Sequence, residues 1–527
     1  MYDVIIVGGG IAGLTAAAYL TKDNKKVLLL EKEDKVGGLV STFEYKEFTF
    51  DGGIRSIENS GILFPMLKDL DIKIPFSRSI VSLGLENEII TIDSKDAVDA
   101  YQQLLINKFP EDEKAIKKIV KTIYKLMDYL DILYGIDNPL FLDFKRDRAY
   151  IIKTMLPWMF KFMFTVGKIG KYDIPIETFI ASITKNEALN QVISQHFFNQ
   201  TPTFFALSYF SLYLDYNYPK NGTGMVIDAI KDYIINHGGE IKTNTEIINH
   251  DLTIKTVIDQ NQTSYQYEKL LWAANLKHLY EKTNLETILN NKTKQKALFF
   301  KNQISNLRGG DSIQTTYMMT DLDPSYFSKI CTGHFFYTPK TTGDGSFKKQ
   351  IPHILKSHDQ HEIMLWVKGY LENTTFEISM PAVRNEKLAP KGKTGLIVSV
   401  LMSFDLVKHI KTLGFYDLYK TEVESIMVDI LSNSIFPKLK KNTIETFSSS
   451  PLTILSRTNN LDGAITGWAF TNNIIPTVTS MLGVSKSVNT YIPNVYQAGQ
   501  WSYSPAGLPI SILTGKLAAN KISKSLK

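Results

Sequence analysis

Apolar and polar residues at the start of the chain alternate in blocks that predict a strand, a turn, a helix and a second strand. Residues 3–7 are almost continuously apolar, which is typical of a parallel strand buried on both faces. A glycine-rich turn follows at residues 8–13, then an alanine-rich helical run over 14–20 and a second apolar run over 26–30. This order predicts a βαβ unit of a parallel α/β sheet.

A similar succession returns at the other end of the chain. Residues 494–498 are strand-like, residues 499–509 form a loop that contains two glycines, and residues 510–523 predict a helix. In the middle of the chain, residues 225–237 predict a helix and residues 269–274 predict another apolar strand. The sequence therefore predicts one sheet assembled from distant segments.

The remaining segments predict a second sheet and a helical region. Residues 335–337 and 394–401 are strand-like, and two interpretations are open: they line a sheet under an elongated tunnel, or they are plain core, which is the more frequent role of such apolar runs. Residues 110–113 (Pro-Glu-Asp-Glu) predict a helix start, with proline early and acids in the first turn, and the apolar side chains that follow recur at the spacing of a core-facing helix. These side chains are Ile116, Ile119, Val120, Ile123, Met127, Leu130 and Tyr134.

Residues 149–170 combine aromatic and methionine side chains with interleaved lysines. Two interpretations are open. The stretch is a helix lying in a membrane interface, or it is a lid or core helix over a substrate tunnel. Both interpretations imply an apolar ligand nearby.

Composition narrows the classes of function. A chain of 527 residues suits two or three domains. The net charge of +6 is small for this length, so we expect no nucleic-acid partner. Cys331 is the single cysteine, which excludes an intrachain disulfide and a thiolate metal cluster; its expected role is that of a small buried apolar residue. The sequence has no HExxH motif, and its one close group of histidines, His353, His358 and His361, lies in a polar stretch that we expect at the surface. We therefore expect no metal site.

Two features bear on the location of the protein. No run of 18 apolar residues occurs, so we expect no membrane-spanning helix. A strand-like run begins at Tyr2, without the basic segment of a cleavable signal. We therefore expect a cytoplasmic protein, with peripheral membrane contact through residues 149–170 as one of the two interpretations above.

The turn at residues 8–13 has the G-x-G-x-x-G spacing of dinucleotide-binding proteins. Gly8 would form the tight turn, Gly10 would let a pyrophosphate approach the backbone, and Gly13 would let helix and strand pack closely. The helix that follows would offer free N–H groups to the phosphates. Glu31, at the end of the second strand, would accept hydrogen bonds from the adenosine ribose.

Further glycines extend this pattern beyond an ADP moiety. Glu31 and Lys32 are followed by Gly37-Gly38, and Phe50-Asp51-Gly52-Gly53 comes shortly after. Paired glycines let the backbone run close to a ligand. With these elements the chain resembles the FAD-dependent oxidoreductases related to phytoene desaturase, carotenoid isomerase and retinol saturase.

The resemblance implies a non-covalently bound FAD, with the C-terminal glycine loop closing over the ribityl chain and the flavin ring. Two positions depart from the wider superfamily: Gln500 stands where an acid is frequent, and Leu39 where arginine is common. The cofactor-binding residues that the resemblance implies are Gly8, Gly10, Ile11, Ala12, Gly13, Glu31, Lys32, Gly37, Gly38, Leu39, Gly53, Ile54, Arg55, Ile247, Gly499, Gln500, Gly507, Leu508 and Pro509.

No second dinucleotide motif is evident. Gly222-Thr223-Gly224 lacks the third glycine, and Tyr218-Pro219 before it is a poor strand. We therefore expect electrons to reach or leave the flavin through oxygen, a quinone or a diffusing donor. As groups that could transfer a proton near the flavin, the sequence offers Arg55, Tyr503 and His334. A structural role or a contact with FAD is the alternative for Arg55 and Tyr503.

The order of the segments predicts an α/β fold with interleaved domains. A Rossmann-like FAD-binding domain would comprise residues 1–95, 218–284 and 451–527, and an α+β substrate domain residues 285–450. A helical lid or membrane-contact subdomain would comprise residues 96–217.

The expected activity is hydride transfer to or from an apolar polyene or isoprenoid, as a desaturase, saturase or isomerase. One alternative is a flavin oxidase of an amine or a tetrapyrrole. Another, from a different class, is a non-catalytic escort protein that binds prenyl lipids, of the kind represented by GDP-dissociation inhibitors, which share the fold and do not use FAD.

Overall fold

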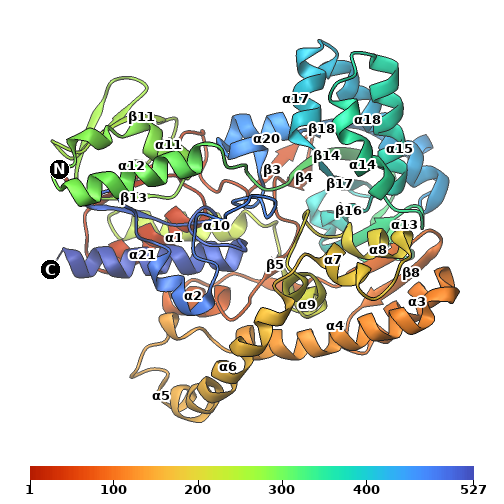
Figure 1. Ribbon diagram of the computed structural model, residues 1–527, viewed down its shortest axis with the longest axis horizontal. Coiled ribbons are helices and arrows are strands. Elements are labelled where there is room, and N and C mark those ends of the chain that lie inside the picture. Colours follow the sequence, from red (N-terminus) through yellow and green to blue (C-terminus); the bar gives the residue numbers. More distant parts are fainter. Residues whose placement is uncertain (527) are drawn as a thin grey trace.

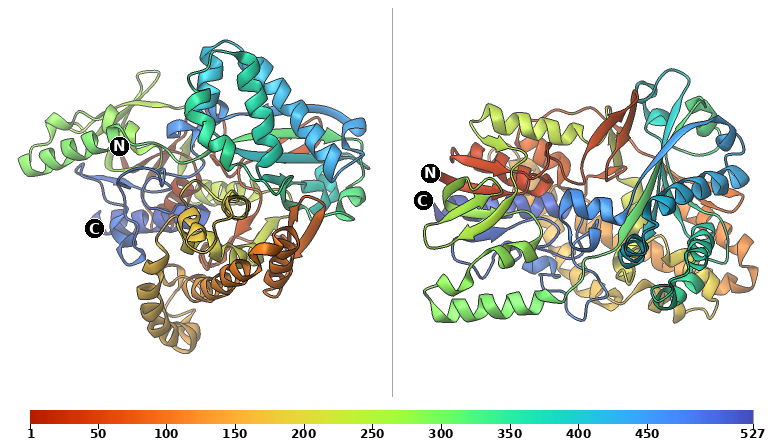
Figure 2. Two further views of the ribbon diagram at one scale, coloured as in Figure 1. Left: turned by 45° about the vertical axis from the view of Figure 1, so that its right-hand side comes forward. Right: turned by 90° about the horizontal axis from the view of Figure 1, so that it is seen from above.

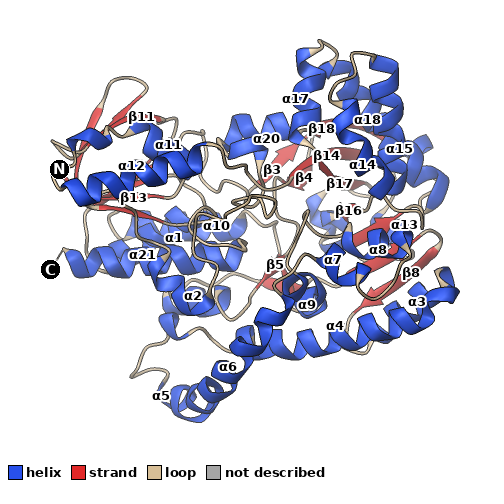
Figure 3. Ribbon diagram, viewed as in Figure 1, coloured by secondary structure: helices blue, strands red, loops and turns tan. Residues whose placement is uncertain are grey.

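The structure is a computed structural model and describes residues 1–526, which form two large sheets and a helical region (Figures 1 and 3). The first sheet has seven strands. Its parallel part runs in the order β10 (Glu240–Lys242), β2 (Val27–Leu30), β1 (Tyr2–Val7), β13 (Ser264–Trp272) and β19 (Val495–Gln497). The strands β11 (Ile247–Asp251) and β12 (Thr256–Asp259) extend β13 in antiparallel fashion. The predicted sheet built from distant segments is confirmed.

Helices cover both faces of this sheet, as the unbroken apolar run of β1 requires. Val4 and Ile6 pack towards α1 (Ile11–Lys22), α10 (Met225–Asn236) and α21 (Leu508–Ser525). Ile5 and Val7 pack towards α11 (Leu276–Lys282) and α12 (Asn291–Ser305) on the opposite face.

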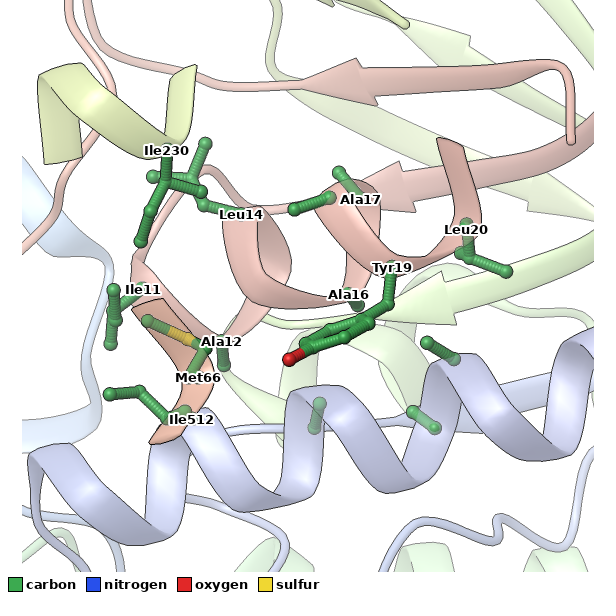
Figure 4. Close-up of a cluster of buried hydrophobic side chains, with 14 of the residues drawn as sticks. Ile11, Ala12, Leu14, Ala16, Ala17, Tyr19, Leu20, Met66, Ile230 and Ile512 are labelled. Carbon is green, nitrogen blue, oxygen red and sulfur yellow. The ribbon is translucent and has the colours of Figure 1, made fainter. Parts of the chain in front are cut away.

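Helix α1 is enclosed by neighbours, and every residue from Ile11 to Thr21 is buried. Its alanines make room for α21, which runs alongside it (Figure 4). The two backbones come closest at Gly515, where an added Cβ would lie 2.5 Å from the Ala12 carbonyl oxygen. Small side chains on both helices thus permit this close contact.

The second sheet also has seven strands, in the order β18-β14-β17-β16-β15-β7-β8. Their bounds are β7 Val81–Leu85, β8 Glu88–Ile92, β14 Ser312–Thr320, β15 His334–Thr338, β16 Phe376–Ser379, β17 Thr394–Met402 and β18 Thr443–Ser449. The strands predicted at 335–337 and 394–401 lie in it as β15 and β17. An apolar core joins this sheet to α15 (Gln360–Asn373) and α18 (Tyr416–Ser434).

The packing differs from the predicted domain boundaries at two places. The strands β7 and β8 fall within residues 1–95, yet β7 pairs with β15 of the second sheet. Helix α12 falls within residues 285–450, yet Ala297 and Ile304 pack against the first sheet. The sheet to which each segment belongs is set by the strand with which it pairs or the side chains against which it packs. The local pattern of apolar residues predicts neither.

A small three-stranded sheet connects distant parts of the chain. It consists of β5 (Ile57–Glu58), β9 (Tyr216–Pro219) and β6 (Phe76–Arg78), with β9 in the centre. Our interpretation of Tyr218-Pro219 as a poor strand was wrong. Pro219 is the last residue of β9, where a missing N–H is tolerated.

The helical region contains α3 (Ala97–Lys108), α4 (Glu113–Tyr134) and α9 (Thr203–Leu214), which share one core. Six of the seven predicted core residues of α4 are buried, and Tyr134 is partly buried. A second helical arm protrudes from this region at the lower edge of Figure 1. It consists of α5 (Arg148–Tyr150), a π-helical stretch (Ile151–Met155) and α6 (Leu156–Ile169). Among residues 1–526, none of the helices is both long enough and apolar enough to cross a membrane.

Candidate functional site

The turn between β1 and α1 uses two of its glycines for close packing. Gly8 has φ +106°, and a Cβ there would lie 2.7 Å from the Ala273 carbonyl oxygen. A Cβ at Gly13 would lie 2.0 Å from the Gly8 carbonyl oxygen. Gly10 is different, since a Cβ there would meet nothing within 4 Å. The backbone at Gly10 thus borders open space, as an approaching pyrophosphate requires.

The start of α1 offers unpaired donors to this space. Gly10 is the N-cap and has no side chain to accept a hydrogen bond, and the first turn carries no acidic residue. The intrahelical ladder begins with the Leu14 N–H, which donates to the Gly10 carbonyl at 3.0 Å. The N–H groups of Ile11, Ala12 and Gly13 precede that ladder and have no partner in it, which is the arrangement that anions favour at helix starts.

Glu31 lies beside the turn at the end of β2. Its carboxylate accepts hydrogen bonds from the N–H of Gly9 (2.6 Å) and the N–H of Glu33 (2.9 Å). Burial raises the pKa of Glu31, and these N–H groups act in the opposite direction. Lys32, also a predicted cofactor residue, points elsewhere: its ammonium donates to the Ser456 carbonyl of α20 (Pro451–Thr458).

The second glycine pair lies directly on the first turn. Gly37 forms a parallel bridge with Gly10, and its N–H donates to the Gly9 carbonyl at 2.8 Å. Gly37 and Gly38 have φ +128° and +58°, conformations that favour glycine. A Cβ at Gly38 would meet only the Gly10 Cα, at 3.5 Å. The open space at Gly10 therefore continues along Gly38.

The next predicted residues continue from this pair. The Ile54 N–H donates to the Leu39 carbonyl at 3.0 Å. A Cβ at Gly53 would lie 2.0 Å from the same carbonyl oxygen, so only glycine lets the two segments pack this closely. Ile247 is the first residue of β11. Two residues before it, the Thr245 N–H donates to the Glu31 carbonyl at 2.8 Å, so the start of β11 lies beside the end of β2.

The C-terminal element meets the N-terminal turn. The Gly499 N–H donates to Thr514 Oγ1 at 2.9 Å, and a Cβ at Gly499 would lie 3.3 Å from the Ala12 Cβ. The backbone of Gln500 packs instead on Gly467, where a Cβ would lie 1.9 Å from the Gln500 carbonyl oxygen. The two glycine loops of the chain are thus neighbours in space.

Helix α21 also begins without a side-chain cap. Gly507 is its N-cap, Leu508 and Pro509 are its first residues, and its first turn has no acid. Nothing lies closer to a Cβ at Gly507 than Glu58 Oε1, at 3.8 Å. Ile11 and Ala12 of α1 and Ile512 of α21 lie at the same end of the helix pair (Figure 4). Both uncapped helix starts therefore open towards the same side.

We refer to the backbone from Gly37 to Gly53 as the glycine track. Arg55 follows it and is 2% exposed. Its guanidinium donates to the Asp51 carbonyl (2.6 Å) and to Ser399 Oγ (3.0 Å), and its Nε has no partner among the described residues. The Asp51 carboxylate, also buried, accepts from Thr42, Tyr218 and Thr223. Arg55 thus lies between the glycine track and β17 of the second sheet.

His334 is the centre of an adjacent polar cluster. Nδ1 is 2.9 Å from Ser56 Oγ, Nε2 is 3.0 Å from Glu377 Oε1, and the ring stacks on Tyr216. Burial lowers the pKa of His334. Burial acts to raise the pKa of Glu377, but the hydrogen bond to His334 and the positive charges of Arg55 and Arg384 hold it below its usual value.

The three predicted proton-transfer candidates do not come together. Arg55 and His334 share the neighbourhood of Glu377. Tyr503 is buried and donates its hydroxyl to the Thr479 carbonyl at 3.2 Å. Sequence reasoning did not single out Glu58 and Glu377. The sequence offered a signal for Glu58, an acid three residues after Arg55, but none for Glu377, which joins the cluster by strand pairing.

Aromatic side chains next to His334 pack on the apolar core of the helical region, and we refer to Phe336, Tyr213, Tyr209 and Phe197 as the aromatic wall. Phe336 of β15 packs on Tyr213 of α9 with ring centroids 5.4 Å apart, and Tyr209 packs on Phe197 at 5.7 Å. His196 is enclosed beside Phe336, and burial lowers its pKa to about 4.

Comparison with known proteins supports the dinucleotide character of the first unit. Residues 6–70 match the family model of the NAD(P)-binding Rossmann-like domain. The chain is 27% identical over 289 residues to a zebrafish (Danio rerio) protein named inactive all-trans-retinol 13,14-reductase. This match covers 50% of this chain and 43% of the relative. A prolycopene isomerase 2 from an Oncidium hybrid is 28% identical over 27% of this chain and 26% of its own. A carotenoid 3,4-desaturase of Haloarcula japonica is 51% identical over 10% of each chain.

The chain is similar in sequence to proteins named for retinoid and carotenoid chemistry, of which the zebrafish relative is named inactive. The resemblance predicted from the glycine motifs is therefore confirmed, although the matched segments span less than half the length of these relatives. Among solved structures, putrescine oxidase bound to putrescine superposes with a TM-score of 0.62 at 13% identity, covering 99% of this chain and 98% of that one. At this identity the likeness shows the fold alone, an α/β fold that contains a Rossmann-like domain.

Proposed function

We propose that the protein is an oxidoreductase that binds FAD non-covalently and exchanges hydride with a polyene or isoprenoid. The observation that carries the proposal is the open backbone at Gly10 and Gly38 beside the uncapped start of α1, together with the uncapped start of α21, whose Ile512 lies at the same end of the helix pair as Ile11 (Figure 4). A ligand that spans two helix starts fits a pyrophosphate at one and a flavin at the other.

The residues present fit this cofactor. The free N–H groups of α1 would hold the pyrophosphate, and Glu31 would hold the ribose. The Gly499 loop and the start of α21 would hold the ribityl chain and the flavin. The flavin, when bound, supplies the hydride acceptor or donor. The polarised N–H groups at the start of α21 would stabilise negative charge on that ring.

The nature of the substrate is supported by the aromatic wall and by the names of the relatives. Phe336, Tyr213, Tyr209 and Phe197 would position an apolar chain and exclude water from it. Arg55 and the His334–Glu377 pair stand at the polar end of this wall and would orient the reacting segment.

The test is the visible spectrum of the purified protein before and after heat release. Flavin bands that move into the supernatant support non-covalent FAD. The FAD-loaded protein is then prepared with its flavin reduced and with its flavin oxidised. Each form is incubated separately with all-trans-retinol, with a cis-carotenoid and with putrescine, and the products are separated by chromatography. Conversion of a polyene supports the proposal. A colourless protein that takes up no FAD, or turnover of the amine alone, contradicts it.

We also propose that α6 rests on a membrane surface, from which an apolar substrate would be collected. Of the two interpretations of residues 149–170, a core helix is excluded because Thr165 is the one buried residue of α6. Phe160 and Phe164 are 72% and 73% exposed, Met159 and Met163 are also exposed, and Lys161 and Lys168 lie among them. The arm stands away from the body in two views (Figures 1 and 2).

Co-sedimentation with vesicles of phosphatidylcholine and phosphatidylserine tests this contact. The double variant Phe160→Ser, Phe164→Ser should reduce the bound fraction at least about tenfold, since each loses apolar area from the interface. Phe299→Ser on α12 is the matched control, because Phe299 is equally exposed (70%) and lies outside the arm. Equal binding of the three proteins would contradict the contact and favour a lid.

A further inference from the structure

We infer that Glu58 is the group that exchanges a proton with the substrate beside the flavin. This inference rests on the proposed function and adds to it a residue that the motifs of the chain do not identify. It is carried by three observations: the carboxylate is without a partner, it faces the start of α21, and it lies beside the aromatic wall.

The Glu58 carboxylate has no hydrogen-bond or ion-pair partner in another described residue. Glu58 is the last residue of β5 and is partly buried. Apart from its own amide, no described residue donates a hydrogen bond to its carboxylate, and no described lysine or arginine forms an ion pair with it. Carboxylates inside proteins are generally paired, because an unpaired one is costly. The His334 ring, in contrast, has both nitrogens engaged, by Ser56 and Glu377.

The position of Glu58 matches the place proposed for the flavin. Its Oε1 lies 3.8 Å from the Cβ position of Gly507, the N-cap of α21. Glu58 also pairs with Tyr216 across the small sheet, and Tyr216 stacks on His334 and donates its hydroxyl to Tyr209 at 3.1 Å. The carboxylate therefore lies where the proposed cofactor site and the aromatic wall meet.

The groups around Glu58 favour its protonated form. From α9 and the residue after it, Tyr209 and Asp215 face it, and from β9 Tyr216 does. The first turn of α21 contributes no charged side chain. Burial raises the pKa of Glu58 to about 7, and the Asp215 carboxylate adds to this rise. Both forms of Glu58 are thus accessible near neutral pH, as a general acid or base requires.

The chemistry balances in either direction. In saturation, the O–H bond of Glu58 breaks and its proton forms a C–H bond at one carbon of the substrate double bond. The hydride for the other carbon comes from reduced FAD, which is thereby oxidised. In desaturation the Glu58 carboxylate takes the proton and oxidised FAD accepts the hydride. Water exchanges the proton of Glu58 between turnovers, and a diffusing electron donor or acceptor restores the flavin.

The first experiment needs only the FAD-loaded protein. Flavin absorption is recorded from pH 5 to pH 9 for the wild type, Glu58→Gln and Asp215→Asn. The wild type should show a spectral transition with a midpoint near 7, because a carboxylate that ionises next to the ring perturbs its absorption. Glu58→Gln should lose the transition, and Asp215→Asn should move the midpoint to lower pH while retaining it.

The second experiment measures the proton itself. In a single turnover with a polyene substrate, Glu58→Gln should slow product formation at least about 100-fold, the usual range for loss of a general acid or base. Glu58→Asp should recover part of the rate and keep the spectral transition. A loaded Glu58→Gln protein with an unchanged transition, or with an unchanged rate, overturns this inference. Failure of the wild type to bind FAD overturns the proposed function instead.

Discussion

The turn at Gly8–Gly13 and the polar cluster around His334 border the same site but are built in opposite ways. The turn comes from six consecutive residues whose spacing already sets the backbone path. The cluster brings together Ser56, Tyr216, His334 and Glu377, which are up to 321 positions apart in the chain (377 − 56) and lie on different strands or beside them.

This difference implies different tolerances. The turn depends on the absence of side chains, so that any added atom meets backbone at Gly8 or Gly13 and open space at Gly10. The cluster depends on mutual pairing of side chains, so that removing one partner leaves another unpaired in the interior. Four substitutions test this comparison, and we order them by expected effect.

The largest effect is expected for Gly13→Val. The Cβ would lie 2.0 Å from the Gly8 carbonyl oxygen, and neither backbone can move without opening the α1–β1 packing. We expect the free energy of unfolding to fall by about 3 kcal/mol and FAD binding to be lost. Urea denaturation and the visible spectrum check both. A variant that is stable and yellow would show that the turn is less tightly packed than described.

The second effect concerns Glu377→Gln. Glu377 is the one carboxylate with a direct hydrogen bond to His334, and the Arg55 and Arg384 guanidiniums are near it. Removing its charge should lower the free energy of unfolding by about 2 kcal/mol, because buried positive charge then lacks its counter-charge. Thermal denaturation near pH 7.5 measures the loss. An unchanged midpoint would mean that the cluster is solvated.

The third effect is a gain of stability at high pH from Glu58→Gln. A carboxyl whose pKa is raised by folding to about 7 stabilises the protein while it is protonated in the folded state. That contribution is complete below the unfolded pKa and is lost as pH rises towards 7. The free energy of unfolding of Glu58→Gln should therefore exceed that of the wild type by about 2 kcal/mol at pH 8, with no advantage at pH 4, as urea denaturation at the two pH values would measure. Equal pH profiles would contradict the raised pKa.

The smallest effect on stability is expected for Gly10→Ala. Its Cβ would meet nothing within 4 Å, so the free energy of unfolding should change by less than about 1 kcal/mol. The methyl group would nevertheless occupy the space proposed for the pyrophosphate, and FAD affinity should fall at least about tenfold. Titration with FAD alongside urea denaturation separates the two quantities. A large loss of stability would contradict the distinction between Gly10 and Gly13.

Some elements of the fold could be predicted from the sequence because the pattern of apolar residues that indicates them is local. The βαβ unit, the helix over 113–134 and the strands at 335–337 and 394–401 follow from apolar periodicity alone. The sequence did not predict that β7 and β8 belong to the second sheet or that α12 packs against the first, because the residues that they contact lie far away in the chain. The same holds for β9, where a proline suggested that no strand would form.

The exposure of α6 shows a further limit. Its pattern and that of α4 are both amphipathic, yet α4 buries its apolar side against α3 and α9 while α6 presents aromatic side chains to the outside. Periodicity reports that an apolar face exists but not what covers it.

The sequence by itself determined the path of the backbone around Gly8, Gly10 and Gly13, because steric exclusion by a Cβ is a property of each residue and its immediate neighbours. It also determined that a second glycine loop at Gly499 would exist. Only the tertiary structure decided that the two loops meet, and that Glu58 is left unpaired while Glu377 is paired with His334. Pairing and desolvation depend on which distant segments pack together, and these set the chemistry of the site.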